Sequence, residues 1–308
     1  MIKNLIIKKN NSLNLKKYIK KNHKKILKKY LYYGCVIFRN FKVKNLKEFQ
    51  STVFSSHKNI LNYNESSTPR TEIKKKIYTS TEISNKFTIP LHNELSYSKK
   101  YPRNLWFYCE KPSLTGGETS IASTRKVFKR INKKISNLFK EKKIKYIRRY
   151  GYGADLSWKN VFNTDKKNVV EKYCKKNGFK IKWEGNKLIT EQTNNATLNH
   201  PIHKFEIWFN QAHLFHNSNL NKKTKKAFLK IFGKNKFPRD AKFGDNSNIS
   251  YRYLNHIRNA FKKEKYKIKW KKGDVVLIDN FHISHGREKY TGNRKLYVIM
   301  TNDNNFSF

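Results

Sequence analysis

The sequence predicts a mainly β fold, in which a double-sheet core carries helical insertions, and three observations support this class. Short apolar strands are expected near both ends of the chain, at 35–38, 105–109, 275–279 and 295–300. Helical patterns occupy much of the chain between them, and glycine-containing turns separate the extended segments. A doubly wound α/β fold is less compatible, because no GxGxxG motif follows a first strand.

The N-terminal third is expected to begin with helices that precede the metal-binding motif. A lysine-rich amphipathic helix is predicted over 12–33, because its apolar positions recur three, four or seven residues apart, and Gly34 ends it. A second helix is predicted over 45–61. The polar stretch 62–85 predicts a loop near the mouth of the active site, and the segment 87–91 is expected to be extended.

The middle of the chain mixes both kinds of element. A helix is expected over 123–140, started by Ser123 or Thr124, and short strands such as 180–183 are expected among later helices. The helical pieces are predicted at 165–177, 221–232 and 250–264. Because no internal repeat or linker is evident, we expect one domain over 1–308, with a mixed helical and strand insertion at about 123–270.

Composition allows a sizeable core but gives an unusual charge. Of the 308 residues, 37% are hydrophobic and 14% aromatic, which excludes a disordered chain. Lys and Arg total 69 against 21 Asp and Glu, a formal net charge of +48. Lysines are spread along the chain and accompany abundant Asn, Ile, Tyr and Phe, a pattern typical of AT-rich codon usage. The alternative is a binder of nucleic acid or another polyanion.

Cysteine usage and the N-terminus bear on the compartment. Cys35, Cys109 and Cys174 are far apart and odd in number, with no zinc-like spacing, so reduced thiols in a cytoplasm are expected. The first nine residues contain no apolar signal-peptide region, and no apolar run approaches the roughly 20 residues of a membrane helix. We therefore expect a cytoplasmic protein without a membrane partner.

The chemistry is indicated first by Leu91-His92-Asn93-Glu94. Residues two apart on a strand point to the same side, so an HxE on an extended segment can deliver an imidazole and a carboxylate to one point. His285 follows the apolar strand 275–279 and is the candidate third ligand. Two imidazoles and one carboxylate are typical of non-haem Fe(II) oxygenases. A chance HxE among 10 histidines remains the alternative for this motif taken alone.

Two further residues indicate a 2-oxo acid. Thr119 follows Gly116-Gly117, where a backbone can approach a ligand closely, and its hydroxyl can donate to a carboxylate. Arg294 precedes the last strand, and a guanidinium binds a carboxylate through two parallel hydrogen bonds. The alternative for Arg294 is an ordinary surface cation of a very basic chain.

Taken together, these motifs resemble the TauD/TfdA (taurine dioxygenase) family of Fe(II)/2-oxoglutarate-dependent oxygenases. The resemblance is greatest to the syringomycin-pathway aspartyl hydroxylase-like branch found in nonribosomal-peptide and polyketide pathways. It extends in order over about residues 30–300. The matching stretches are LHNELSYSKKYPRNLWFYCEKPSLTGGETSIASTRKVFKRI (91–131), LSWKNVFNTD and VEKYCKKNGFKIKW (within 156–183), WFNQAHLFH (208–216), FPRDAKFGDNSNI (237–249) and KWKKGDVVLIDNFHISHGREKYTGNRKLYVIM (269–300).

The resemblance implies a fold, a reaction and a set of roles. The fold is a double-stranded β-helix, the jelly roll of clavaminate synthase-like proteins, with helices packed outside. The implied iron ligands are His92, Glu94 and His285, and Thr119 and Arg294 are the implied 2-oxoglutarate contacts. Fe(II) is the implied cofactor, with 2-oxoglutarate and O2 as co-substrates. Many relatives carry Asp as the carboxylate ligand; halogenating relatives lack one, so Glu94 favours hydroxylation, with desaturation and ring closure left open.

Several other residues are candidates for lesser roles. Asn93, Asn210 and Arg287 are candidate substrate contacts, and Arg287 has the alternative of pairing with Asp279 or Glu288. His213 and His216 could suggest a second metal site, but no third ligand is evident and packing or support roles are favoured. Substrate-binding loops are expected at 62–85 and 144–205.

The sequence thus predicts an oxygenase that hydroxylates an amino-acid, acyl or carrier-tethered intermediate of secondary-metabolite biosynthesis. Its partner would be a small molecule or a carrier protein bearing one, with no specific nucleic acid. Two alternatives come from other classes: a basic polyanion-binding module, and a non-catalytic relative of the family with a structural role.

Overall fold

In the computed structural model, residues 2–9, 13–63, 65, 67–233 and 236–303 are described. The predicted ranges 12–33 and 62–85 therefore include positions, 12, 64 and 66, that lie outside the described residues, as do both ends of the predicted domain.

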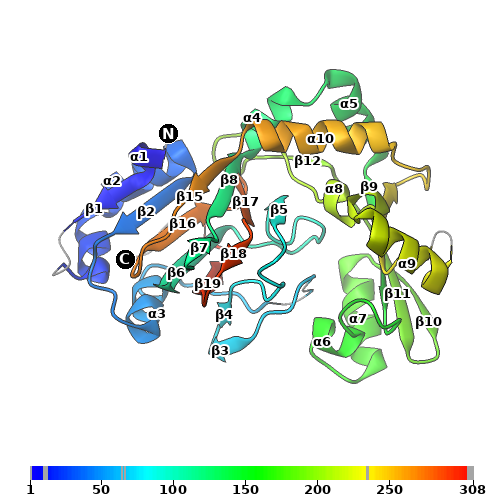
Figure 1. Ribbon diagram of the computed structural model, residues 1–308, viewed down its shortest axis with the longest axis horizontal. Coiled ribbons are helices and arrows are strands. Elements are labelled where there is room, and N and C mark those ends of the chain that lie inside the picture. The colour runs from blue at the N-terminus through cyan, green and yellow to red at the C-terminus, as the bar shows by residue number, and fades with distance from the viewer. Residues whose placement is uncertain (1, 10–12, 64, 66, 234–235, 304–308) are drawn as a thin grey trace.

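The larger sheet of the core has seven strands, which come from both the N-terminal and the C-terminal parts of the chain (Figure 1). All four strands predicted from apolar runs lie in it as consecutive neighbours. In spatial order the strands are β1 (Ile6–Lys8), β2 (Cys35–Arg39), β16 (Val275–Asp279), β6 (Asn104–Lys111), β19 (Lys295–Thr301), β4 (Ile77–Thr79) and β3 (Glu72–Lys74).

A four-stranded sheet faces the larger one and completes the double-sheet core. Its spatial order is β15 (Tyr266–Ile268), β8 (Thr119–Ser123), β17 (Ile283–Arg287) and β5 (Ile89–His92). Alternate residues of each strand point to the space between the sheets, so Val276 and Ile278 of β16 pack with Ile121 and Ile283 of the smaller sheet. A short pair, β7 (Thr115–Gly116) and β18 (Tyr290–Thr291), adjoins them. The arrangement confirms the predicted jelly roll.

Helices cover the outer face of the larger sheet, beside the short α1 (Ile2–Leu5). The predicted N-terminal helix is α2 (Leu15–Tyr33), and Gly34 ends it with φ +69°. The next helix, α3 (Leu46–Phe54), is shorter than the predicted 45–61. It stops because the hydroxyls of Ser55 and Ser56 both donate to the carbonyl of Thr52, which competes with helix continuation. The predicted loop 62–85 contains the short strands β3 and β4.

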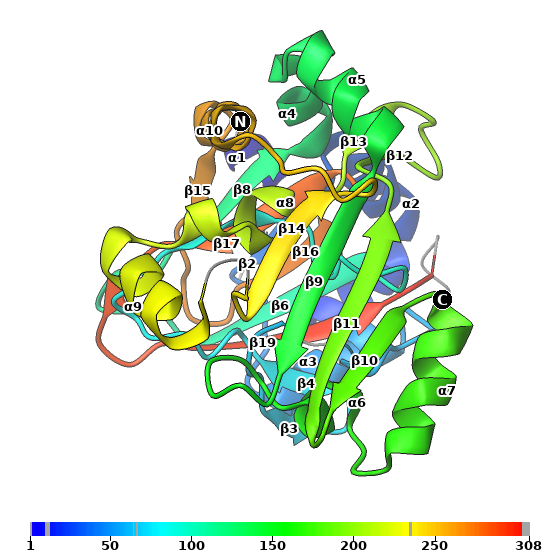
Figure 2. The ribbon, with the colours of Figure 1, turned by 90° about the vertical axis from the view of Figure 1, so that its right-hand side faces the viewer.

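Between β8 and β15 the chain builds a separate layer of helices and a third sheet (Figure 2). That sheet has the order β10 (Lys180–Glu184), β11 (Lys187–Asn194), β9 (Ile144–Tyr150) and β14 (Arg239–Phe243). Only one of its strands was predicted. The remaining elements are α6 (Trp158–Phe162), α7 (Lys167–Asn177), β12 (Thr197–Asn199), β13 (Glu206–Trp208), α8 (Ala212–Phe215), a 3-10 turn at Asn217–Asn219, α9 (Lys222–Phe232) and α10 (Tyr251–Lys263). Core pairing resumes at β15, which binds β8.

The helix predicted over 123–140 is in fact two helices, α4 (Thr124–Arg130) and α5 (Lys133–Lys142). The break lies at Ile131 and Asn132, whose backbones are extended; the Asn132 side chain accepts a hydrogen bond from the backbone N–H of Lys134 and starts the second helix. Among the described residues, no helix combines the length and apolar character needed to cross a bilayer.

Candidate metal centre

Strand pairing brings two predicted ligands together. Strand β17 lies between β5 and β8, and its residue His285 is paired directly with His92 of β5, with ring centroids 4.6 Å apart. Gly286 permits this pairing, because a Cβ at that position would lie 2.5 Å from the carbonyl oxygen of Ile89. Antiparallel pairing therefore sets the separation of the two imidazoles.

The carboxylate reaches the same point by a different route from the one that the sequence suggested. Strand β5 ends at His92, so Glu94 is not its strand neighbour two residues on; it lies in the following turn, next to Leu95 at φ +55°. Asn280, which lies five residues before His285 in the sequence, fixes that turn. Its side-chain oxygen accepts from the N–H of Glu94 at 2.7 Å, and its Nδ2 donates to the carbonyl of Glu94 at 3.0 Å.

His92, Glu94 and His285 offer ligand atoms that all lie within 4.8 Å of one another, the one such group among the described residues. The Nδ1 of His92 lies 2.8 Å from the carbonyl oxygen of Pro90. When Nδ1–H donates to this oxygen, Nε2 is left free to bind a metal. Burial lowers the pKa of His92 to about 4. Burial would raise the pKa of Glu94, but Arg70 and the two imidazoles hold it at about 2. A neutral His92 and an ionised Glu94 fit a ferrous ion.

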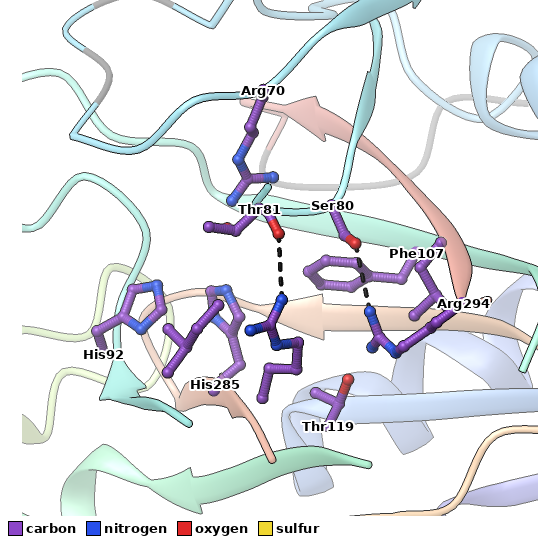
Figure 3. Close-up of a pocket in the computed structure, with 12 residues that line it drawn as sticks. Arg70, Ser80, Thr81, His92, Phe107, Thr119, His285 and Arg294 are labelled. Atoms are coloured by element: carbon purple, nitrogen blue, oxygen red, sulfur yellow. Dashed lines mark hydrogen bonds between the residues drawn. The ribbon is translucent and has the colours of Figure 1, made fainter. Parts of the chain in front are cut away.

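Arg287, Arg294 and Thr119 line the same pocket, and we call their part of it the arginine end. Figure 3 shows Arg294 and Thr119 on the side away from His92. Arg294 donates to the carbonyl of Gly117 at 3.1 Å and to the hydroxyl of Ser80 at 3.3 Å. Burial and the neighbouring Arg287 lower the pKa of Arg294 to about 10. Thr119 lies opposite Arg287 on the neighbouring strand, and its hydroxyl accepts from the indole N–H of Trp270 at 3.0 Å.

The arginine end has no acidic partner, and this fits an anionic co-substrate. Within the described residues, the hydrogen bonds of Arg287 and Arg294 go to backbone carbonyls and one hydroxyl, and neither forms an ion pair. Two adjacent guanidinium groups without a carboxylate attract a dicarboxylate. The cavity volume is about 30 Å³, so a five-carbon diacid requires movement of the long side chains that line it.

The candidate substrate contacts are placed unequally. Asn93 is fully buried and its amide donates to the carbonyl of Asn280. The side-chain Nδ2 of Asn210 donates to the carbonyl of Ala196, and its Oδ1 accepts from the N–H of Ala212. Neither asparagine lines the pocket. Both side chains bind backbone groups, and these contacts give no support to a substrate role.

Arg287 does line the pocket, but most of its guanidinium is used elsewhere. It donates to the carbonyls of Ile83, Ser84 and Phe87 at 2.8 to 2.9 Å and so anchors the loop 81–87. Neither of the partners considered from sequence binds it. Asp279 is bound by Arg103 and His200, and Glu288 by Lys265, Lys267 and Ser120.

The other histidines do not form a second metal site within the described residues. The Nε2 of His213 lies 3.0 Å from the carbonyl of Leu91, directly before His92, and its ring stacks on Phe261. His216 accepts from the N–H of Ser218 and caps the 3-10 turn. These contacts are of the packing and support kind that the sequence favoured.

Two residues of the site were missed from the sequence. Asn280 lies inside the matching stretch 269–300, and its position five residues before His285 was the available signal. Arg70 gave no signal beyond its place in the polar stretch 62–85. That stretch supplies Arg70, Ser80 and Thr81 to the pocket, whereas no residue of the other predicted substrate loop, 144–205, lines it.

Comparisons with known proteins agree with this geometry. The family model described as "Taurine catabolism dioxygenase TauD, TfdA family" matches residues 5–300. The chain belongs to the TauD/TfdA family. It is 37% identical over 268 residues to the dapdiamide synthesis protein DdaC of Enterobacter agglomerans, covering 87% of this chain and 82% of that one. It is 27% identical over 285 residues to a clavaminate synthase-like protein of Arabidopsis thaliana, covering 87% and 81%.

The fold has solved counterparts as well. The crystal structure of AAD-2 in complex with Mn(II) and N-oxalylglycine superposes with a TM-score of 0.54 at 11% identity, covering 99% of this chain and 96% of that one. Family membership and the His-X-Glu…His group together make this TauD/TfdA protein an Fe(II)/2-oxoglutarate-dependent oxygenase, and the predicted enzyme class and cofactors are confirmed. The polyanion-binding alternative is not favoured.

Proposed function

We propose that this protein hydroxylates a small-molecule intermediate, with His92, Glu94 and His285 as the iron ligands and Thr119 and Arg294 as the 2-oxoglutarate contacts. One observation carries the proposal: both imidazoles of a two-imidazole, one-carboxylate group line the same pocket as two arginines that have no acidic partner among the described residues. A metal at one end and a carboxylate-binding guanidinium at the other suit a 2-oxo acid that chelates iron.

The residues of the chain contribute binding and orientation rather than acid–base chemistry. Fe(II) with 2-oxoglutarate supplies the oxidation of a C–H bond by O2. The backbone carbonyl of Pro90 sets the His92 tautomer, and Asn280 holds Glu94 facing the imidazoles. Arg294 fixes the distal carboxylate of 2-oxoglutarate. Phe107 and Leu296 are buried against the pocket and exclude water from it.

Hydroxylation is the outcome we favour over halogenation because Glu94 occupies the position of the carboxylate ligand. A buried, ionised carboxylate beside both imidazoles leaves no ligand position there for a halide. Desaturation and ring closure use the same residues, and identification of the product distinguishes them.

The pathway and the form of the substrate are proposed from the relatives. DdaC is by name a protein of dapdiamide synthesis, which supports a role for this chain in secondary-metabolite biosynthesis on an amino-acid or acyl intermediate, free or tethered to a carrier protein. Cys35, Cys109 and Cys174 are buried free thiols, which supports a reducing cytoplasm. Mass spectrometry that finds one added oxygen atom on a loaded carrier, but not on the matched free acid, would establish tethering.

The reaction class is tested by succinate formation. Purified protein is supplied with Fe(II) and 2-oxoglutarate in air, and the slow succinate release without a primary substrate is measured. Omission of either component, or the substitution His92→Ala, is expected to abolish it, whereas the exposed-residue control His203→Ala is expected to retain it. Succinate release by His92→Ala equal to that of the unmodified protein would contradict the proposal.

A further inference from the structure

Arg70 reaches the metal centre from a loop that is distant in sequence. It precedes β3, lines the pocket and points toward the two histidines (Figure 3). Its Nη2 donates to Oε2 of Glu94 at 2.7 Å, and its side chain is only 2% exposed. The same carboxylate oxygen lies 3.6 Å from Nε2 of His285. Arg70 is thus fixed beside the proposed iron ligands, on the side of the pocket away from the strand β8.

One ion pair does not use all of this guanidinium. Within the described residues, Nε and Nη1 of Arg70 are buried and have no hydrogen-bond acceptor. The ring of Tyr63 lies 4.9 Å from the guanidinium carbon. A guanidinium keeps its positive charge even when it is buried. Buried guanidinium donors without an acceptor are unfavourable, and an acceptor from a ligand would relieve this.

The balance of charge indicates the sign of that ligand. Arg70, Arg287 and Arg294 bring three cationic groups to the pocket lining, and Glu94 is the acidic group beside them. Addition of Fe(II) and of the two carboxylates of 2-oxoglutarate still leaves positive charge in excess. Arg287 and Arg294 lie at the arginine end, so Arg70 is the cation that remains available next to the metal.

We propose that Arg70 binds a carboxylate of the primary substrate and thereby selects small acids, or acyl groups that bear a free carboxylate, for oxidation. This inference rests on the proposed function, because it takes the metal and 2-oxoglutarate positions as given. The ion pair with Glu94 fixes the guanidinium plane, and the Nη1 or the Nε donor is left to receive an oxygen of the substrate carboxylate. Arg70 is then a specificity-determining residue.

A different role makes a different prediction. If Arg70 serves only to balance the charge of Glu94, its removal weakens metal binding and leaves anion binding next to the metal unchanged. If Arg70 is the carboxylate site, its removal abolishes that anion binding even where the metal and the co-substrate analogue still bind. The two roles are separated by a measurement that does not depend on turnover.

The probe is acetate, the smallest suitable carboxylate, added to full-length protein loaded with Mn(II) and N-oxalylglycine. Mn(II) is paramagnetic, so it accelerates relaxation of the methyl protons of acetate bound nearby, and titration gives the acetate Kd. We expect saturable enhancement in the unmodified protein, a Kd at least tenfold higher in Arg70→Gln, and a smaller weakening in Arg70→Lys, which keeps the charge but not the planar donors. The control Arg252→Gln, an exposed arginine of α10, is expected to behave as the unmodified protein.

Each outcome decides between the possibilities. Absence of enhancement in the unmodified complex, or enhancement that persists in Arg70→Gln, would overturn the inference; the second result would mean that acetate binds the metal itself or another cation. The proposed function is checked in the same samples by the Mn(II) resonance spectrum. If Mn(II) and N-oxalylglycine fail to bind the unmodified protein, the proposed function fails; if they bind and acetate does not, only the role of Arg70 fails.

Discussion

The two ends of the pocket are built on opposite principles. At the metal end, His92, Glu94 and His285 are short side chains, and strand pairing and Asn280 set where they lie. At the arginine end, Arg287 and Arg294 are long side chains with surplus positive charge and no acidic partner among the described residues. The metal end is prepared by backbone geometry and the arginine end by electrostatics. A substitution should therefore damage the first through position and the second through charge and hydrogen bonding.

The largest expected effect is at the metal end. His285→Ala removes one of the two imidazoles that β5 and β17 hold in register, and we expect Mn(II) or Fe(II) affinity and succinate formation to fall more than about 100-fold, beyond the effect of losing a supporting contact. Calorimetric metal titration measures it. An equal loss in His203→Ala, whose imidazole is exposed on the surface, would show that the effect is not specific to the metal end.

At the arginine end, Arg294→Lys keeps the positive charge but loses the planar arrangement of donors. We expect the Kd for 2-oxoglutarate to rise about 10- to 100-fold, equivalent to roughly 1.5–3 kcal/mol for a charged hydrogen-bonded contact. Metal affinity without 2-oxoglutarate should be unchanged. An equal loss of metal affinity in Arg294→Lys would contradict the separate roles of the two ends.

Asn280→Ala tests whether the metal end depends on backbone position. The substitution leaves all three proposed ligands in place but removes the amide that binds the N–H and carbonyl of Glu94. We expect metal affinity to fall about tenfold. Asn255→Ala, an exposed position on α10, is the matched control. Unchanged metal affinity in Asn280→Ala would mean that the turn at Glu94 holds its shape without Asn280.

The smallest expected effect concerns the support of β5 by His213. Burial lowers its pKa from 6.5 to about 3, so as pH falls below 6.5 the unfolded chain takes up a proton that the folded chain does not. Stability from this group is therefore fully present above pH 6.5 and is lost as pH falls toward 3. When the pH is lowered from 6.5 to 5, we expect the free energy of unfolding to fall by about 1–2 kcal/mol less in His213→Gln than in the unmodified protein. Urea unfolding at both pH values measures it, and identical pH dependence would contradict the assignment.

How far the sequence predicted the molecule depends on the range of the interactions concerned. The strands β2, β6, β16 and β19 were found because their apolar runs are local patterns, and α2 because its apolar face and Gly34 are local too. The third sheet was largely missed, since β9, β11 and β14 are polar on one face and pair across long separations. The break between α4 and α5 was missed because Asn132 fits a helix by composition and acts as a cap only once the chain turns.

By itself, the sequence singled out the residues that we propose to carry the chemistry: the HxE motif, the later histidine, and a threonine and an arginine suited to a dicarboxylate. Only the tertiary structure decided how they meet. Glu94 reaches the imidazoles through a turn held by Asn280, 186 residues away, and Arg70 joins Glu94 from a loop whose sequence carries no motif. The physical reason is that the chemistry of each residue is fixed by the sequence. The position of its side chain depends instead on which distant residues bind the backbone that carries it.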